Sequence, residues 1–148
     1  MQTTHWMPRS ALLGLTLLAA ACGGGDHNPT GPGGGGGIAG TWTLVGINED
    51  GLPESEDYNF GTADFQSGSL RLSQDGQWEM KIFYDHVEQN QSLQLDDYGQ
   101  YGRDNQDLSF ASEAYGDHIE GGLDDGFVYM IYDFDGDGEY ETEFTFER

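Results

Sequence analysis

The nine residues before the C-terminal arginine alternate strictly in character, and this alternation most constrains the fold. One set of positions carries Tyr140, Thr142, Phe144 and Phe146. The intervening positions carry four glutamates and one threonine. Successive side chains of a β-strand point to opposite faces, so this segment has one face suited to a core and one suited to water. The pattern predicts a half-buried antiparallel strand at residues 139–147 and an all-β domain.

Seven further segments between residues 38 and 138 are β-rich or alternate in the same way, and no helical period persists there. Turn sequences such as Asp-Gly separate several of them, as hairpins require. The predicted strands cover residues 40–48, 69–73, 77–85, 98–103, 107–112, 118–123, 127–132 and 139–147. Residues 49–66 and 87–96 are predicted as loops. Eight short antiparallel strands favour an up-and-down barrel, which leaves no open sheet edge, and a β-sandwich is the alternative.

The N-terminal segment has the organisation of an export signal. Residues 1–10 are polar and include Arg9, and residues 11–21 are apolar except for Thr16. This apolar run is shorter than the roughly 20 residues that a membrane-spanning helix needs, but it has the length of a signal-peptide core. We therefore assign residues 1–21 to a signal peptide.

Cys22 follows this segment directly and is the only cysteine of the chain, so no disulfide can form within it. The sequence Leu-Ala-Ala-Ala-Cys at residues 18–22 resembles the lipobox of bacterial lipoproteins, although Ala19 stands where leucine is usual. The resemblance implies cleavage before Cys22, acylation of its thiol with chains such as palmitate, and a membrane anchor in the cell envelope. Gly23 at the next position favours the outer membrane. An ordinary secretory signal with an incidental cysteine is the alternative.

Residues 22–37 are expected to tether the anchor to the domain. They are rich in glycine and proline and carry no large apolar side chain, which is typical of a flexible linker. The remaining residues, 38–148, are enough for one domain.

The charge of the chain limits its partners. It has 27 acidic against 5 basic residues and a formal net charge of −22. Such a surface repels the phosphates of nucleic acids, which proteins bind through lysine and arginine. It suits metal cations, a cationic partner, or a salty medium in which acid-rich surfaces stay hydrated. The aromatic content of 13% excludes a disordered acidic tail.

A second resemblance concerns the domain. Gly40-Thr41-Trp42 resembles the Gly-X-Trp motif that opens the first strand of lipocalins, and residues 68–78 are similar to bacterial lipocalin-like lipoproteins. The resemblance implies an eight-stranded barrel in which an arginine near the last strand, here Arg148, packs over Trp42. It also implies a small hydrophobic ligand inside the barrel. The side chains expected to line that cavity are Trp42, Trp78, Phe110, Phe127, Tyr129, Phe144 and Phe146.

Residues 133–141, Asp-Phe-Asp-Gly-Asp-Gly-Glu-Tyr-Glu, form the clearest candidate metal site. The first six match the start of an EF-hand loop, but Phe144 stands where the twelfth position needs a glutamate. The segment is more similar to calcium loops at β-hairpin tips, in which the ninth position supplies the last carboxylate. The predicted ligands are Asp133, Asp135, Asp137, a backbone carbonyl at Glu139, and Glu141. An Asp-Gly hairpin turn without metal is the alternative.

Enzyme signatures are missing from the sequence: it has no nucleophile elbow, phosphate loop or zinc spacing. His86 and His118 adjoin aspartates and are expected at solvated strand ends. We therefore expect a protein that binds and does not catalyse. Two hypotheses follow, a module that binds a small hydrophobic ligand and an acidic envelope module with a filled core, in which calcium could add stability.

Overall fold

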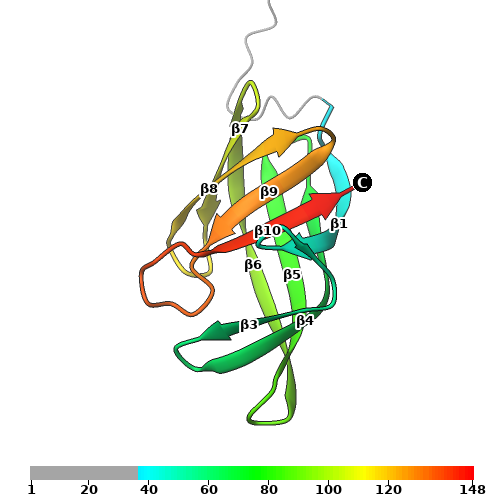
Figure 1. Ribbon diagram of the computed structural model, residues 1–148. Helices are drawn as coiled ribbons and strands as arrows, with labels where there is room; N and C mark the ends of the chain where they lie inside the picture. The colour runs from blue at the N-terminus through cyan, green and yellow to red at the C-terminus, as the bar shows by residue number, and fades with distance from the viewer. Residues whose placement is uncertain (1–36) are drawn as a thin grey trace, which may run out of the picture.

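The computed structural model describes residues 37–148, so the signal peptide at residues 1–21, Cys22 and the tether lie outside the described residues except for Gly37. The described part of the chain contains strands and no helix (Figure 1). This confirms the all-β prediction. The strands are β1 Gly40–Ile47, β2 Asp50–Gly51, β3 Glu54–Tyr58, β4 Gly61–Leu72, β5 Gln77–His86, β6 Gln91–Asp104, β7 Asp107–Ser112, β8 His118–Asp124, β9 Phe127–Tyr132 and β10 Thr142–Glu147.

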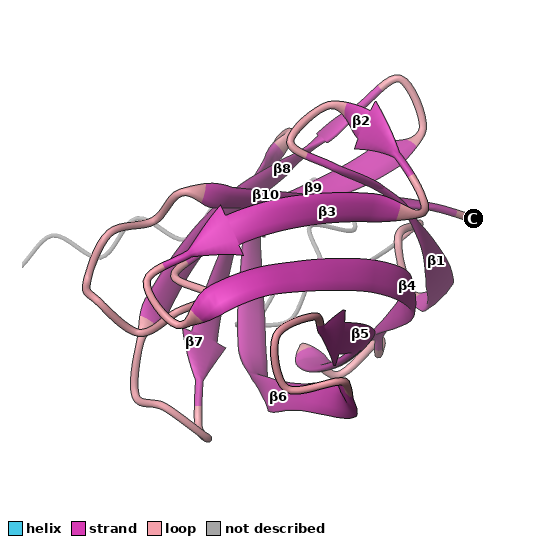
Figure 2. Cartoon of the chain, turned by 60° about the horizontal axis from the view of Figure 1, so that its bottom comes forward, coloured by secondary structure: helices cyan, strands magenta, loops and turns pink. Residues whose placement is uncertain are grey.

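Eight of these strands close into an antiparallel barrel (Figure 2). From β4 to β10 each strand pairs with the next in sequence, and β1 pairs with both β10 and β4 to complete the ring. The up-and-down barrel is therefore confirmed, and the β-sandwich is not the fold. Its architecture is compatible with the lipocalin-like resemblance.

The two extra strands lie in the segment predicted as the first loop. β3 pairs with the first half of β4, while β1 pairs with its last four residues. Thus β3 takes over from β1 along one edge of β4, and Gln66 lies at the register shift between the two halves. The loop prediction for residues 49–66 was wrong because β3 reads Glu-Ser-Glu-Asp-Tyr, in which the alternation is hidden by acids on both faces.

The loop predicted at residues 87–96 was also wrong. β5 and β6 continue to His86 and Gln91, so only a four-residue turn joins them. Leu93 and Leu95 are half-buried on one face, while Ser92, Gln94 and Asp96 are more exposed on the other. Polar residues outnumber the two leucines in this hairpin, so the alternation of apolar and polar side chains was not apparent in the sequence.

The last strand is shorter than predicted. β10 begins at Thr142, which pairs with Tyr132, the last residue of β9. Residues 133–141 form a loop, named the acidic loop below, in which Gly136 and Gly138 adopt positive φ angles. Tyr140 was predicted to point into the core, but it lies in this loop and is 44% exposed.

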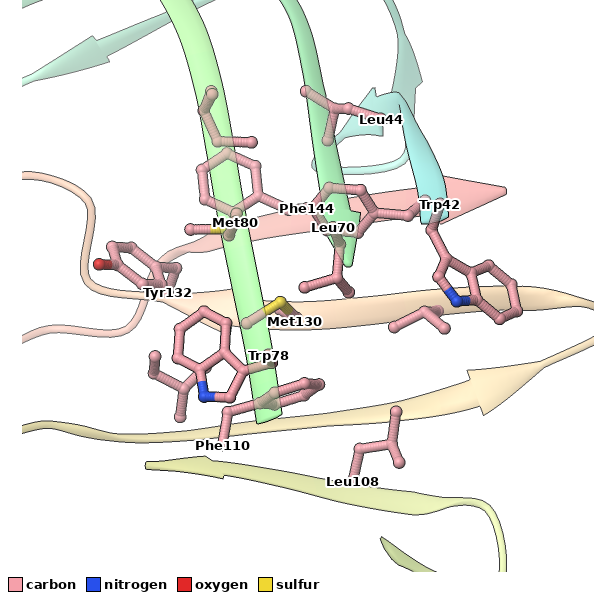
Figure 3. Close-up of a cluster of buried hydrophobic side chains, with 14 of the residues drawn as sticks. Trp42, Leu44, Leu70, Trp78, Met80, Leu108, Phe110, Met130, Tyr132 and Phe144 are labelled. Carbon is pink, nitrogen blue, oxygen red and sulfur yellow. The ribbon is translucent and has the colours of Figure 1, made fainter. Parts of the chain in front are cut away.

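Inward-facing side chains of all eight strands fill the interior of the barrel. Figure 3 shows part of this core. At one end, Arg148 lies over the Trp42 ring, 5.1 Å from the ring centroid to its guanidinium carbon. The guanidinium also donates to the backbone carbonyls of Gly37 and Ala39. This confirms the expected contact between Trp42 and Arg148.

Candidate functional site

Five of the seven residues predicted to line a ligand cavity lie in the hydrophobic core. Each is at most 4% exposed, and each belongs to the buried hydrophobic cluster. Figure 3 labels four of them within this cluster. The Trp78 and Phe110 rings, for example, meet edge to face with centroids 5.5 Å apart. The five are Trp42, Trp78, Phe110, Phe144 and Phe146. These rings occupy the interior that a ligand would need.

The other two predicted cavity residues lie on the outside. In β9 the inward-facing positions are Val128, Met130 and Tyr132, so Phe127 and Tyr129 face outward. Phe127 is 38% exposed, and Tyr129 lies over Gly122 of β8, where a Cβ atom would meet its ring. The prediction was wrong because all six residues of β9 are apolar or aromatic, which removes the alternation that identifies the inner face.

The acidic loop brings together four of the predicted metal ligands. Carboxylate oxygens of Asp133, Asp135, Asp137 and Glu141 all lie within 4.8 Å of one another. Loss of hydration, followed by the charges of the three aspartates, raises the pKa of Glu141 above its ordinary value. Gathered carboxylates of this kind repel one another unless a cation is present.

The backbone of the acidic loop curls around Asp133. Its carboxylate accepts hydrogen bonds from the amides of Gly136, Asp137 and Gly138 at 2.8–3.1 Å. The side chain of Glu139 is outside the group, and its amide donates to Asp137. The positive φ angles of both glycines allow this tight path.

Phe134, in the same loop, has a role that the sequence analysis did not identify. Its ring packs among aromatic side chains of β3, β4, β5 and β10 and of the β3–β4 turn. A single hydrogen bond also joins the loop to this region, from the amide of Asn59 to Asp135 at 3.2 Å. Figures 1 and 2 show the loop beside the β3–β4 hairpin. An apolar residue between two aspartates was the one signal that could have indicated this docking.

Asp97 is a second feature that sequence reasoning missed. It lies on the inner face of β6 and is 1% exposed. One carboxylate oxygen accepts hydrogen bonds from the Ser112 hydroxyl and the Tyr98 amide, both at 2.7 Å, and the other accepts from the Tyr132 hydroxyl at 2.8 Å. Burial, together with this hydrogen bond and the charge of Asp97, raises the pKa of Tyr132. Asp97, Ser112 and Tyr132 are all buried, and we assign the network to stability.

The two histidines of the domain have different settings. His118 is exposed at the start of β8, as expected. His86 is 5% exposed, and its Nδ1 lies 3.4 Å from a carboxylate oxygen of Glu88. Glu88 also accepts hydrogen bonds from the backbone and side chain of Thr62, which fastens the β3–β4 hairpin to the end of β5. The expectation of a solvated strand end was wrong for His86.

Comparison of the chain with protein-family models, curated proteins and solved structures gives no match. Within the described residues, no helix is long and apolar enough to cross a membrane.

Proposed function

We propose that this chain is an exported, lipid-anchored envelope protein whose barrel works as an acidic interaction module with a filled interior. The packing of the barrel carries the proposal, because five of the seven side chains expected around a ligand are buried members of one hydrophobic core. A hydrophobic ligand inside the barrel would have to displace them. A cationic partner would then bind to the outer surface of the barrel.

The outer face of β4 and β5 offers a place for a cationic partner. Asp64 and Asp85 stand directly opposite each other in the two strands. Asp64 accepts a hydrogen bond from the Ser55 hydroxyl of β3 at 2.6 Å, and Asp85 accepts one from the Ser92 hydroxyl of β6 at 2.5 Å. Like charges in such a cross-strand pair destabilise a sheet, and a lysine or arginine side chain between them would relieve that repulsion. Both aspartates line a surface groove of about 390 Å³.

An octalysine peptide tests this surface by calorimetric titration of the purified chain. Neutralising the opposed pair with Asp64→Asn and Asp85→Asn should weaken binding about five-fold, equivalent to roughly 1 kcal/mol. Neutralising Asp124, the last residue of β8, and Asp125, which follows it, changes the total charge equally and should have a much smaller effect. Equal losses in both variants would mean that only the overall charge attracts the peptide.

The membrane anchor depends on Cys22. The apolar segment, the small residues before Cys22 and the glycine-rich tether support acylation at this position. Several acyl chains hold a protein on a bilayer far better than one, because each buried methylene group contributes about 0.8 kcal/mol. We expect Cys22→Ser to move the protein from the membrane fraction to the soluble fraction. Wild-type protein that is soluble and carries an unmodified thiol, as judged by mass spectrometry, would contradict the anchor.

We also propose that the acidic loop binds calcium weakly, through Asp133, Asp135, Asp137, the carbonyl of Glu139, and Glu141. The convergence of four carboxylates supports this. Calcium prefers six to eight oxygen ligands, and extracellular modules bind it at about 10⁻⁴–10⁻³ M. Phe134 would transmit the effect to the barrel, because ordering the loop also fixes its ring.

Calcium at ten times its dissociation constant should stabilise the folded protein by about 1.4 kcal/mol, by mass action. A thermal melt with and without calcium, in moderate salt to screen diffuse attraction, measures this shift. The variant carrying Asp135→Asn and Asp137→Asn should lose it, whereas the same change at Asp124 and Asp125 should not. If magnesium stabilises all three proteins as well as calcium does, the loop is an acidic turn without a specific site.

A further inference from the structure

A recess lined by aromatic rings lies at the end of the barrel where β3 replaces β1, and a ring of the acidic loop fills it. We propose that this recess is a binding site for a small uncharged molecule with one aromatic ring, and that Phe134 occupies it as an internal substitute. The centroid of the Phe134 ring lies 4.8 Å from that of Tyr58, 5.0 Å from those of Phe65 and Tyr84, 5.9 Å from that of Phe60 and 6.2 Å from that of Phe144.

The walls of this recess contact one another without the help of Phe134. The Tyr58 ring stacks on Phe60 at 5.4 Å, and Phe65 meets both Tyr84 and Phe144 at about 6 Å between centroids. The Tyr58 hydroxyl shares a 2.8 Å hydrogen bond with the Thr142 hydroxyl, which ties β3 to β10. The recess therefore keeps its shape when the loop moves away.

The position of the recess follows from the strand pairing. β1 pairs with β4 only at its last four residues, and the adjoining stretch of β4 pairs with β3 instead. Among the recorded pairings, β3 has no ladder with β10, so side chains and the acidic loop close the barrel on this side. A site closed by side chains can open without breaking any ladder of the barrel.

Few hydrogen bonds join the loop to the rest of the barrel. The side-chain hydrogen bonds recorded within residues 133–141 join the loop to itself, apart from the one between Asp135 and Asn59. That contact is exposed to solvent. The ring of Phe134, which is half-buried, is thus the main apolar attachment of the loop. The loop can leave as a small folded unit that carries Phe134 with it.

Charge repulsion opposes this attachment. Residues 133–141 include five carboxylates and no lysine or arginine. Glu56 of β3 lies on the same side: burial chiefly raises the pKa of Tyr58, and the charges of Glu56, Glu141 and Asp135 raise it further. These acids repel one another over about 10 Å in 0.1 M salt. Aromatic packing closes the loop and charge repulsion opposes closure, so repulsion lowers the free-energy cost of opening the loop.

The chemistry of the ligand follows from the group that it replaces. Phe134 contributes one benzyl ring, and the walls offer ring faces and edges at the separations that aromatic pairs prefer. An apolar cavity of about 150 Å³ is enough for benzene. An anion would meet the surrounding carboxylates, so an uncharged aromatic molecule fits best. The apparent affinity of the wild-type protein for this ligand equals the affinity of the open state multiplied by the fraction of molecules in which the loop is open.

Fluorine NMR titration with 4-fluorotoluene tests this site in the purified full chain. Wild-type protein should bind the probe, and Phe134→Ala should bind it at least about ten-fold more tightly because no ring competes. Raising sodium chloride from 20 to 200 mM screens the repulsion that opens the loop, so it should weaken wild-type binding two-fold or more. The salt effect should vanish in Phe134→Ala. The probe carries no charge, so salt changes its binding only by changing how often Phe134 leaves the recess.

The exposed residue Phe127 gives a matched control, since Phe127→Ala removes the same ring from outside the recess and should bind the probe as wild type does. Adding Phe60→Ala to Phe134→Ala removes a half-buried wall and should weaken binding again. A circular dichroism melt of each variant checks that it is folded. The proposal is overturned if folded wild type does not bind the probe, or if Phe134→Ala binds it no better than wild type.

Discussion

Replacing Trp42 by alanine is expected to lower the free energy of unfolding by about 3–5 kcal/mol, the usual cost of truncating a large core side chain. The ring is 4% exposed, and its Nε1–H donates to the backbone carbonyl of Ile38 at 3.0 Å. Truncation would leave a cavity at the end of the barrel and free that carbonyl. Chemical denaturation of wild type and variant measures the difference.

Two further variants separate the contributions of the ring. Trp42→Phe keeps most of the apolar volume and loses the hydrogen bond, so it should cost less than half as much as Trp42→Ala. Arg148→Ala removes the guanidinium over the ring and should cost only about 0.5–1 kcal/mol, as expected of an exposed cation–π contact. An unchanged denaturation midpoint for Trp42→Ala would show that Trp42 does not close the barrel.

The parts of the fold that the sequence predicted are those where one face of a strand is apolar and the other polar. β10 is the clearest example, with Phe144 and Phe146 inside and Glu143 and Glu147 towards solvent. Strand β3 has acids on both faces, because it lies at the margin of the barrel and buries little. In β9 every side chain is apolar or aromatic. A strand that is polar on both faces, or apolar on both faces, lacks the two-residue alternation on which the prediction of strands depends.

The candidate metal site was predictable because all its ligands lie within nine consecutive residues. Spacing and two glycines then suffice to show that Asp133, Asp135, Asp137 and Glu141 can converge. The recess around Phe134 could not be predicted in the same way, since its walls come from four strands and one turn that only the closed barrel brings together. The same applies to Asp97, whose partners Ser112 and Tyr132 are 15 and 35 residues away in sequence.

The second large effect is expected at Asp97. The variant Asp97→Ala would leave the buried hydroxyls of Ser112 and Tyr132 without their acceptor. A buried donor without a partner costs about 1–3 kcal/mol, so we expect a loss of roughly 2–5 kcal/mol in the free energy of unfolding. Part of this loss is offset because a carboxylate is no longer buried. Denaturation of the variant against wild type gives the value.

A double-mutant cycle identifies the network as the cause. In the Tyr132→Phe background one of the two orphaned hydroxyls is already gone, so Asp97→Ala should cost less by about 1–3 kcal/mol, the size of coupling between residues in one network. The neighbouring acid Asp96 is exposed, and Asp96→Ala should change stability by no more than about 0.5 kcal/mol. If Asp97→Ala were as mild as Asp96→Ala, then the hydrogen bonds around the Asp97 carboxylate would contribute nothing to holding β6, β7 and β9 together.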